Sequence, residues 1–71
     1  MELFEKRKIA QMCRVYRAKS NPPMKQDELA KECGLKQHNI SYLEAELWGK
    51  VSAMKIEKVK KYLEMMTGIG A

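Results

Sequence analysis

The fold of this chain is decided by the stretch from Gln26 to Ala45, which reads QDELAKECGLKQHNISYLEA. Leu29 and Cys33 are one helical turn apart in it, as expected on one face of a first short helix. Gly34 follows at once, and glycine adopts at little steric cost the positive φ that commonly ends a helix. These positions predict a helix that stops sharply at Gly34.

The second half of the stretch predicts another helix that packs against the first. Ile40 and Leu43 are one turn apart and mark its inner face. Leu35 lies at the corner, where we expect its side chain to fill the space inside the turn. Ala30 is small, so the two helix backbones can approach each other closely. Two short helices that meet at a sharp turn follow from this pattern.

Together these residues resemble the helix-turn-helix of the lambda-repressor and Cro-like (Xre-type) family of DNA-binding proteins. The positions that match the family pattern are Gln26, Ala30, Gly34, Leu35, Ile40 and Leu43, with Met24 before them. Ser41 and Glu44 add the family's common Ile-Ser-x-x-Glu arrangement, and the resemblance extends from Lys8 to Leu63. It implies a compact all-α, lambda-repressor-like domain of four helices, or five at most, over residues 1–71, with its helix-turn-helix core at residues 25–46.

Two departures from the family pattern affect the ends of these helices. Lys25 stands where the family usually has a Ser or Thr cap, so the first short helix lacks its usual side-chain acceptor. After Ala45 the chain continues with Glu46-Leu47-Trp48-Gly49, a loop that is about one residue longer than the family's. We expect Gly49 to be the turn residue of this loop.

A longer helix is predicted before the core, from Glu2 to Lys19, where the sequence has no Pro and no Gly. Its apolar side chains form one helical stripe, which consists of Ile9, Met12, Cys13 and Tyr16. Pro22 and Pro23 prevent the helix from continuing, because proline lacks the backbone donor and restricts the residue before it.

Three further helices are expected after the double proline. They run from Lys25 to Cys33, from Lys36 or Gln37 to Glu46, and from Ala53 to Met66. Ser52 is a suitable N-cap for the last of them, and Thr67-Gly68 ends it. Its apolar stripe consists of Ile56, Val59, Leu63 and Met66. No strand pattern competes, so the sequence predicts an all-helical bundle with short connections.

The net charge of +5 is distributed unevenly along the chain. Residues 1–19 carry six Lys or Arg and two Glu, and residues 46–71 carry five Lys and three Glu. Residues 24–45, by contrast, carry three Lys and four Asp or Glu, so the predicted reading element is slightly acidic. Phosphate contacts are therefore expected from the flanking helices.

Several classes of protein are disfavoured by the composition. No apolar run approaches the roughly 20 residues of a membrane span, and the N-terminus does not read as a secretory signal. We therefore expect a cytoplasmic protein, and the family resemblance implies a bacterial, phage or plasmid origin. Cys13 and Cys33 are interpreted as small buried hydrophobes, with a disulfide between them as the alternative. His38 is the only histidine, and no acid is placed to orient it, so neither an enzyme nor a metal, cofactor or small-molecule site is expected.

The residues expected to read bases lie at the start of the second short helix, because the N-terminal end of a recognition helix reaches base edges in the major groove. They are Lys36, Gln37, His38, Ser41 and Tyr42. Gln37 can pair with adenine through one donor and one acceptor. Lys36 and His38 can alternatively be solvated, and Tyr42 can serve packing.

The expected phosphate contacts are Gln26, Asn39, Arg14, Arg17 and Lys50. In the family geometry Gln26 also faces Gln37 and orients it. Trp48 either packs the loop onto the core or stays exposed at a dimer contact or beside the DNA backbone.

A single recognition helix covers only a few base pairs, so we predict a homodimer on a near-palindromic operator. Apolar candidates for the dimer contact are Leu47, Trp48, Met65, Met66 and Ile69. The main hypothesis is a small Cro-like transcriptional repressor that binds double-stranded DNA. Two alternatives stay open: an excisionase-like architectural protein, and an antitoxin-type module that acts by binding another protein.

Overall fold

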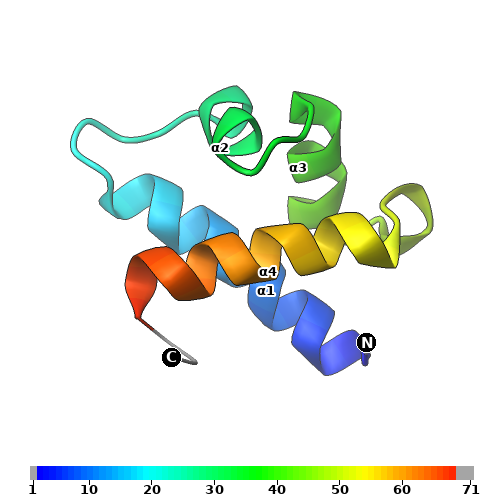
Figure 1. The fold of residues 1–71 in the computed structure, drawn as a ribbon. Helices are drawn as coiled ribbons and strands as arrows, with labels where there is room; N and C mark the ends of the chain where they lie inside the picture. The colour runs from blue at the N-terminus through cyan, green and yellow to red at the C-terminus, as the bar shows by residue number, and fades with distance from the viewer. Residues whose placement is uncertain (1, 69–71) are drawn as a thin grey trace.

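Four α-helices and one short 3-10 helix make up residues 2–68, the part of the chain that the computed structural model describes (Figure 1). The α-helices are α1 (Leu3–Lys19), α2 (Gln26–Glu32), α3 (Gln37–Glu44) and α4 (Ala53–Thr67), and the 3-10 helix η1 (Trp48–Lys50) lies between α3 and α4. This part of the chain contains no strand, which confirms the all-α class.

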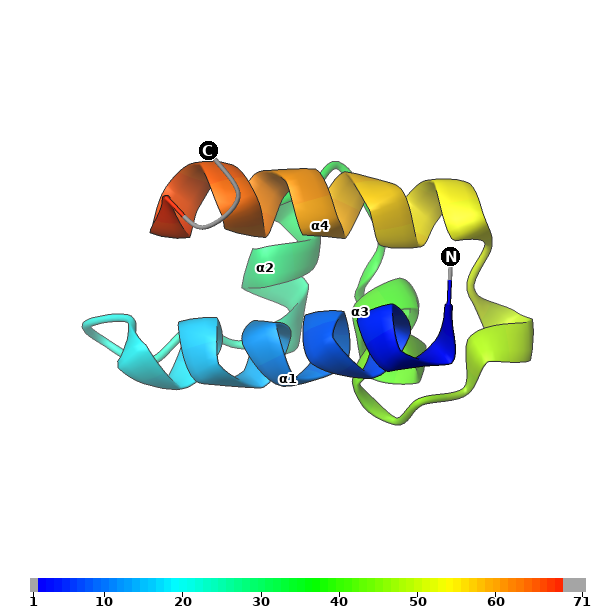
Figure 2. The ribbon, with the colours of Figure 1, turned by 90° about the horizontal axis from the view of Figure 1, so that it is seen from below.

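The helices form two layers. α1 and α4 run in roughly the same direction and lie side by side. α2 and α3 cover one face of this pair (Figures 1 and 2). The rings of Tyr16 on α1 and Tyr62 on α4 meet edge to face, and their hydroxyl oxygens are 3.2 Å apart. Near the start of α1, the Lys60 ammonium donates to the Glu5 carboxylate at 3.2 Å. α1 therefore contacts α4 along most of its length.

One hydrophobic core lies between the layers. It consists of Ile9, Ala10, Cys13, Leu29, Ala30, Ile40, Leu43, Val51, Ile56, Val59 and Leu63. The predicted helical stripes supply most of these residues, because apolar positions three and four apart face the same side of a helix. Met66 departs from its stripe and is 52% exposed. Trp48 is half-buried and packs against the core, which decides between its two interpretations.

Local chemistry explains most of the helix ends. α1 stops at Ser20, before the two prolines, as predicted. α2 lacks a capping side chain at Lys25, and the Glu28 carboxylate instead accepts a hydrogen bond from the Lys25 backbone N–H at 2.9 Å. The Ser52 hydroxyl accepts from the Lys55 backbone N–H at 3.3 Å, and Gly68 ends α4 with φ +75°.

The end of α3 differs from the prediction. The helix stops at Glu44, two residues early, and Glu46 adopts φ +61°. The backbone N–H groups of Glu46 and Leu47 then bond to the carbonyls of Leu43 (3.1 Å) and Tyr42 (2.9 Å), which is the Schellman arrangement. Glu46, rather than the expected Gly49, is therefore the turn residue with positive φ. Gly49 lies inside η1.

The two cysteines are free thiols. Cys13 is fully buried, and its burial, with the Glu44 carboxylate nearby, raises the pKa of its thiol to about 12. Cys33 is half-buried, and desolvation raises its pKa to about 11. Both side chains therefore act as protonated packing residues at neutral pH.

Residues 2–68 contain neither a candidate membrane-spanning helix nor a candidate metal site. None of the helices there combines the length and the apolar character that crossing a bilayer requires. The His, Cys, Asp and Glu side chains of the same residues form no group of three that could hold a metal ion.

Candidate nucleic-acid interface

The connection between α2 and α3 is a tight turn centred on Gly34. Gly34 has φ +72°, and its N–H bonds to the Lys31 carbonyl at 3.1 Å. The next N–H, of Leu35, bonds to the Ala30 carbonyl at 2.8 Å, and the Leu35 side chain packs against the core. This is again the Schellman arrangement, with glycine at the left-handed position. The turn therefore holds Leu35 against the core, and α3 starts two residues later, at Gln37.

The first residues of α3 and the residue before it project into solvent. Lys36, Gln37 and His38 are exposed, while Ser41 and Tyr42 are half-buried. All five of the expected base-reading residues therefore lie on or directly before one short helix, and the three most exposed ones are consecutive. Their amide, ammonium and imidazole groups can donate to or accept from base edges.

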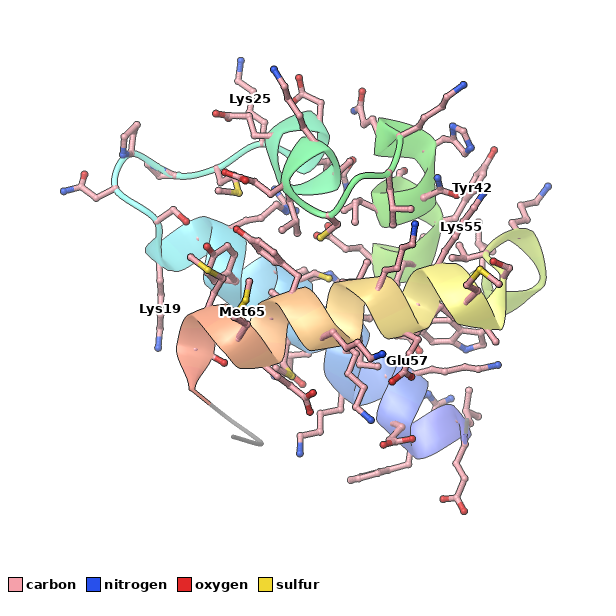
Figure 3. The ribbon with its side chains drawn as sticks, in the orientation of Figure 1. Lys19, Lys25, Tyr42, Lys55, Glu57 and Met65 are labelled. Atoms are coloured by element: carbon pink, nitrogen blue, oxygen red, sulfur yellow. The ribbon has the colours of Figure 1, made fainter. Side chains whose placement is uncertain are left out.

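Tyr42 joins two other groups on this surface. Its ring meets the His38 ring edge-on, with 5.8 Å between centroids, and the Lys50 ammonium lies over it at 5.6 Å. A lysine within about 6 Å of a tyrosine ring is attracted by the ring's electron-rich face. η1 thus brings Lys50 beside α3, and no local sequence pattern indicates this contact between Lys50 and Tyr42. Figure 3 shows Tyr42 at the opposite side of the molecule from Lys19.

A buried carboxylate holds the inner face of α3. Glu44 is 4% exposed. Arg17 from α1 donates to both of its carboxylate oxygens, at 2.6 and 2.8 Å, and the Gln26 amide from α2 donates to one of them at 3.0 Å. A bidentate, charge-assisted pair of this kind is strong and directional. Glu44 therefore connects three helices and fixes the orientation of α3.

This network changes the roles expected for Arg17 and Gln26, two of the expected phosphate contacts. Arg17 also donates to the Met24 carbonyl at 3.2 Å, and its bond to Glu44 raises its pKa. The Gln26 amide points to Glu44, which corrects the expectation that Gln26 would face Gln37. Arg14 is exposed on α1, and its guanidinium donates to the Glu44 backbone carbonyl. Arg17 and Gln26 therefore position α3, while Arg14 keeps donors that face solvent.

Asn39 also lies elsewhere than expected. It is only 3% exposed, and its side-chain oxygen accepts a hydrogen bond from the Lys55 ammonium at 3.5 Å. The expectation that Asn39 lies at the edge of the DNA interface is therefore corrected, because its side chain points into the fold and links α3 to α4. Lys55 was not among the expected site residues. No feature of the sequence marks it, since five lysines lie between residues 50 and 61.

Sequence reasoning also missed the structural role of Glu44. The Ile-Ser-x-x-Glu arrangement was the available signal, because it places a carboxylate one turn after the buried Ile40 and so on the inner face. Comparisons of the chain with protein-family models, with curated proteins and with solved structures find no match.

Proposed function

We propose that this protein binds double-stranded DNA sequence-specifically through a lambda-repressor-like helix-turn-helix at residues 25–46. One observation carries the proposal: three consecutive exposed polar residues, one before α3 and two in its first turn, lie at the start of a short helix whose other face is held by Glu44 to α1 and α2. Rigid presentation of a polar helix end is what major-groove reading requires.

In this proposal α3 enters the major groove with its N-terminal end leading. Gln37 pairs with an adenine through N6 and N7, and Lys36 contacts a guanine or a phosphate. His38 lies against the Tyr42 ring, so this pair acts as one surface toward the next base or the sugar edge. Ser41, half-buried one turn later, completes the reading face.

Phosphate contacts are assigned to Lys50 and Arg14, which are exposed. Lys50 is held beside Tyr42, so it can reach the backbone next to the bases that α3 reads. Arg17 is excluded because Glu44 accepts from its Nε and Nη2 and the Met24 carbonyl accepts from its Nη1. The overall charge of +5 adds attraction that weakens with salt.

Repression requires more contact than one short helix provides, so we propose a homodimer that occupies two half-sites and blocks polymerase. The exposed apolar candidates for the contact are Leu47, Met65 and Met66, which are 45%, 72% and 52% exposed. Trp48 packs inward and is a weaker candidate, and Ile69 lies outside the described residues. In this proposal the protein acts in the cytoplasm of a bacterial host.

Selection from random duplexes followed by gel-shift titration of the enriched site tests this function. We expect a consensus with two related halves, and an affinity that falls steeply between low and high salt. No enriched sequence together with a flat salt response would contradict the proposal. Equal binding to every duplex would instead show that the protein binds DNA only through nonspecific electrostatic attraction.

Replacing Gln37 with alanine separates base reading from backbone contact. We expect a loss of about 1–3 kcal/mol on the selected site and relaxed preference at one base pair, because the paired amide is removed. Gln11→Ala is the matched control, since Gln11 is an exposed glutamine on α1 and has no role in the proposed DNA interface. A uniform loss on all duplexes for Gln37→Ala would mean that Gln37 contacts only the backbone.

A further inference from the structure

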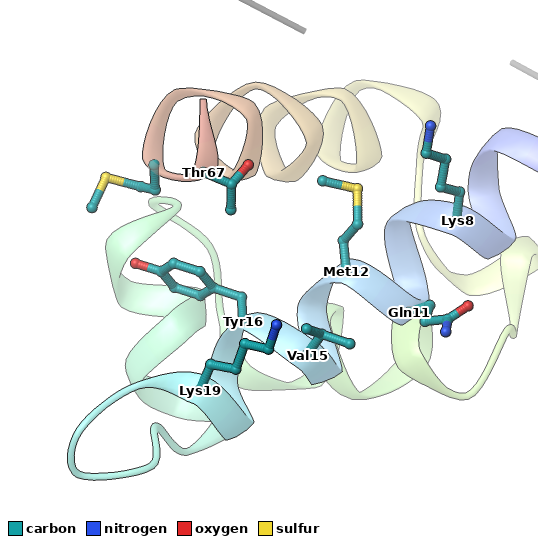
Figure 4. Close-up of a pocket in the computed structure, with 8 residues that line it drawn as sticks. Lys8, Gln11, Met12, Val15, Tyr16, Lys19 and Thr67 are labelled. Carbon is teal, nitrogen blue, oxygen red and sulfur yellow. The ribbon is translucent and has the colours of Figure 1, made fainter. Parts of the chain in front are cut away.

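A groove runs between α1 and the C-terminal end of α4 (Figure 4). Its cavity volume is about 560 Å³. Met12, Val15 and Tyr16 of α1 and Met66 of α4 supply its apolar lining, and lysines lie at its two ends. Val15 and Met66 are 41% and 52% exposed, so the groove is an open trough rather than an enclosed pocket.

The groove lies on the face opposite the proposed DNA interface. α1 and α4 form one layer of the molecule, and α2 and α3 cover the other side of that layer (Figures 1 and 2). A molecule bound in the groove would therefore leave the start of α3 open. Met12 and Tyr16 of the groove also pack against the core, and Met66 is also a candidate for the proposed dimer contact.

The charge of the groove selects its occupant. Among the described residues the charged groups that line it are Lys8 and Lys19, both exposed. They are eleven residues apart on α1, which corresponds to about 16 Å along the helix. The neighbouring hollow shares Lys8 but differs in charge, because it is also lined by the carboxylates of Glu5 and Glu64, and Glu5 pairs there with Lys60 at 3.2 Å.

We propose that this groove docks an acidic amphipathic helix of another protein. An open trough of about three helical turns fits an amphipathic helix whose apolar residues recur at i, i+3, i+4 and i+7. A cation at each end suits carboxylates at both ends of such a helix, whereas a fatty acid carries one carboxylate.

Two synthetic helical peptides with the same leucine pattern, one rich in Glu and one rich in Lys, test this proposal. We expect the Glu peptide to bind and to shift the NMR signals of Met12, Val15, Tyr16 and Met66, while the Lys peptide does not. Lys8→Glu combined with Lys19→Glu should weaken the Glu peptide by roughly tenfold or more, because two attractive end charges become repulsive. Lys58→Glu with Lys61→Glu is the matched control, since both lysines are exposed on α4 and neither lines the groove.

Four outcomes of the peptide and fatty-acid experiments would overturn the proposal. They are equal binding of the two peptides, equal weakening by the control pair, peptide-induced shifts confined to α3, and binding of dodecanoate in the groove without binding of the Glu peptide. Concentration-dependent shifts of the groove residues without peptide, with dimers in sedimentation, would assign the groove to a second copy instead. Circular dichroism verifies that the variants fold. DNA binding is measured separately, so failure there leaves this test unaffected.

Discussion

The two faces of α3 have opposite compositions and, in the proposed function, opposite tasks. The inner face carries Asn39, Ile40, Leu43 and Glu44, all buried, while the outer face carries exposed Gln37 and His38 with half-buried Tyr42 beside them. An eight-residue helix is too short to be stable by itself, so α3 depends on its inner face for its existence. Stability and recognition are therefore expected to separate cleanly by face, and each prediction below tests this separation.

The largest effect is expected from Glu44→Ala. It removes the carboxylate that accepts from Arg17 and Gln26. The Arg17 guanidinium then lacks its anionic partner, although its side chain is only 22% exposed. We expect a loss of about 3 kcal/mol in the free energy of unfolding, at the low end for a broken buried pair because Arg17 keeps some solvent contact. For a domain of this size the melting temperature should fall by more than about 10 °C.

Glu46→Ala is the matched control for this variant. Glu46 also pairs with an arginine, Arg7, at 3.2 Å, but the two side chains are 42% and 64% exposed. Exposed pairs contribute about 0–1 kcal/mol, so this control should change stability little. Similar losses for the two variants in urea titrations would show that Glu44 does not hold the inner face.

The turn before α3 gives the next largest effect. Gly34 has φ +72°, and a Cβ added there would meet nothing within 4 Å. Gly34→Ala therefore tests backbone conformation alone, and we expect it to cost about 1–2 kcal/mol. Gly49→Ala is its control, because a Cβ there also meets nothing within 4 Å and Gly49 has no positive φ. Equal stabilities of the two variants would show that the turn into α3 needs no glycine.

Alkaline pH probes the core beneath the inner face. The pKa of the Cys13 thiol is raised from 9.0 to about 12, so the folded state keeps its proton where the unfolded chain has lost it. Stability should be constant below pH 9 and then fall, by up to about 1.4 kcal/mol per pH unit from this group. Cys13→Ala, compared with its own stability at pH 7, should lose less between pH 8 and 10. An unchanged alkaline loss would exclude Cys13 as its source.

The residues that could be predicted from the sequence are those with a local signal. The helical stripes placed Ile9, Leu63 and most of the core, and the double proline placed the end of α1, because these depend on periodicity and on backbone chemistry. Gly34 belongs to the same group, since glycine marks positive φ.

The residues that were missed depend on partners far apart in the chain. The pair of Arg17 and Glu44 joins positions 27 residues apart, and the bond of Lys55 to Asn39 spans 16. A charged residue gives no sign in the sequence whether it will face solvent or another element. Arg17 was therefore expected to contact phosphate, although the fold commits it to Glu44.

The smallest effect is expected at the end of α3, where Glu46 adopts φ +61° in the same Schellman geometry as Gly34. Comparing Glu46→Gly with Glu46→Ala isolates the backbone, because both variants lack the carboxylate that pairs with Arg7. We expect the glycine variant to be more stable by about 1 kcal/mol in urea titrations, since glycine adopts the left-handed conformation without strain. DNA affinity should be the same for both, because the outer face of α3 is unchanged. A glycine variant that is no more stable than the alanine variant would mean that this end of α3 relaxes out of the left-handed turn, and the inner face would then end at Glu44 without a fixed cap.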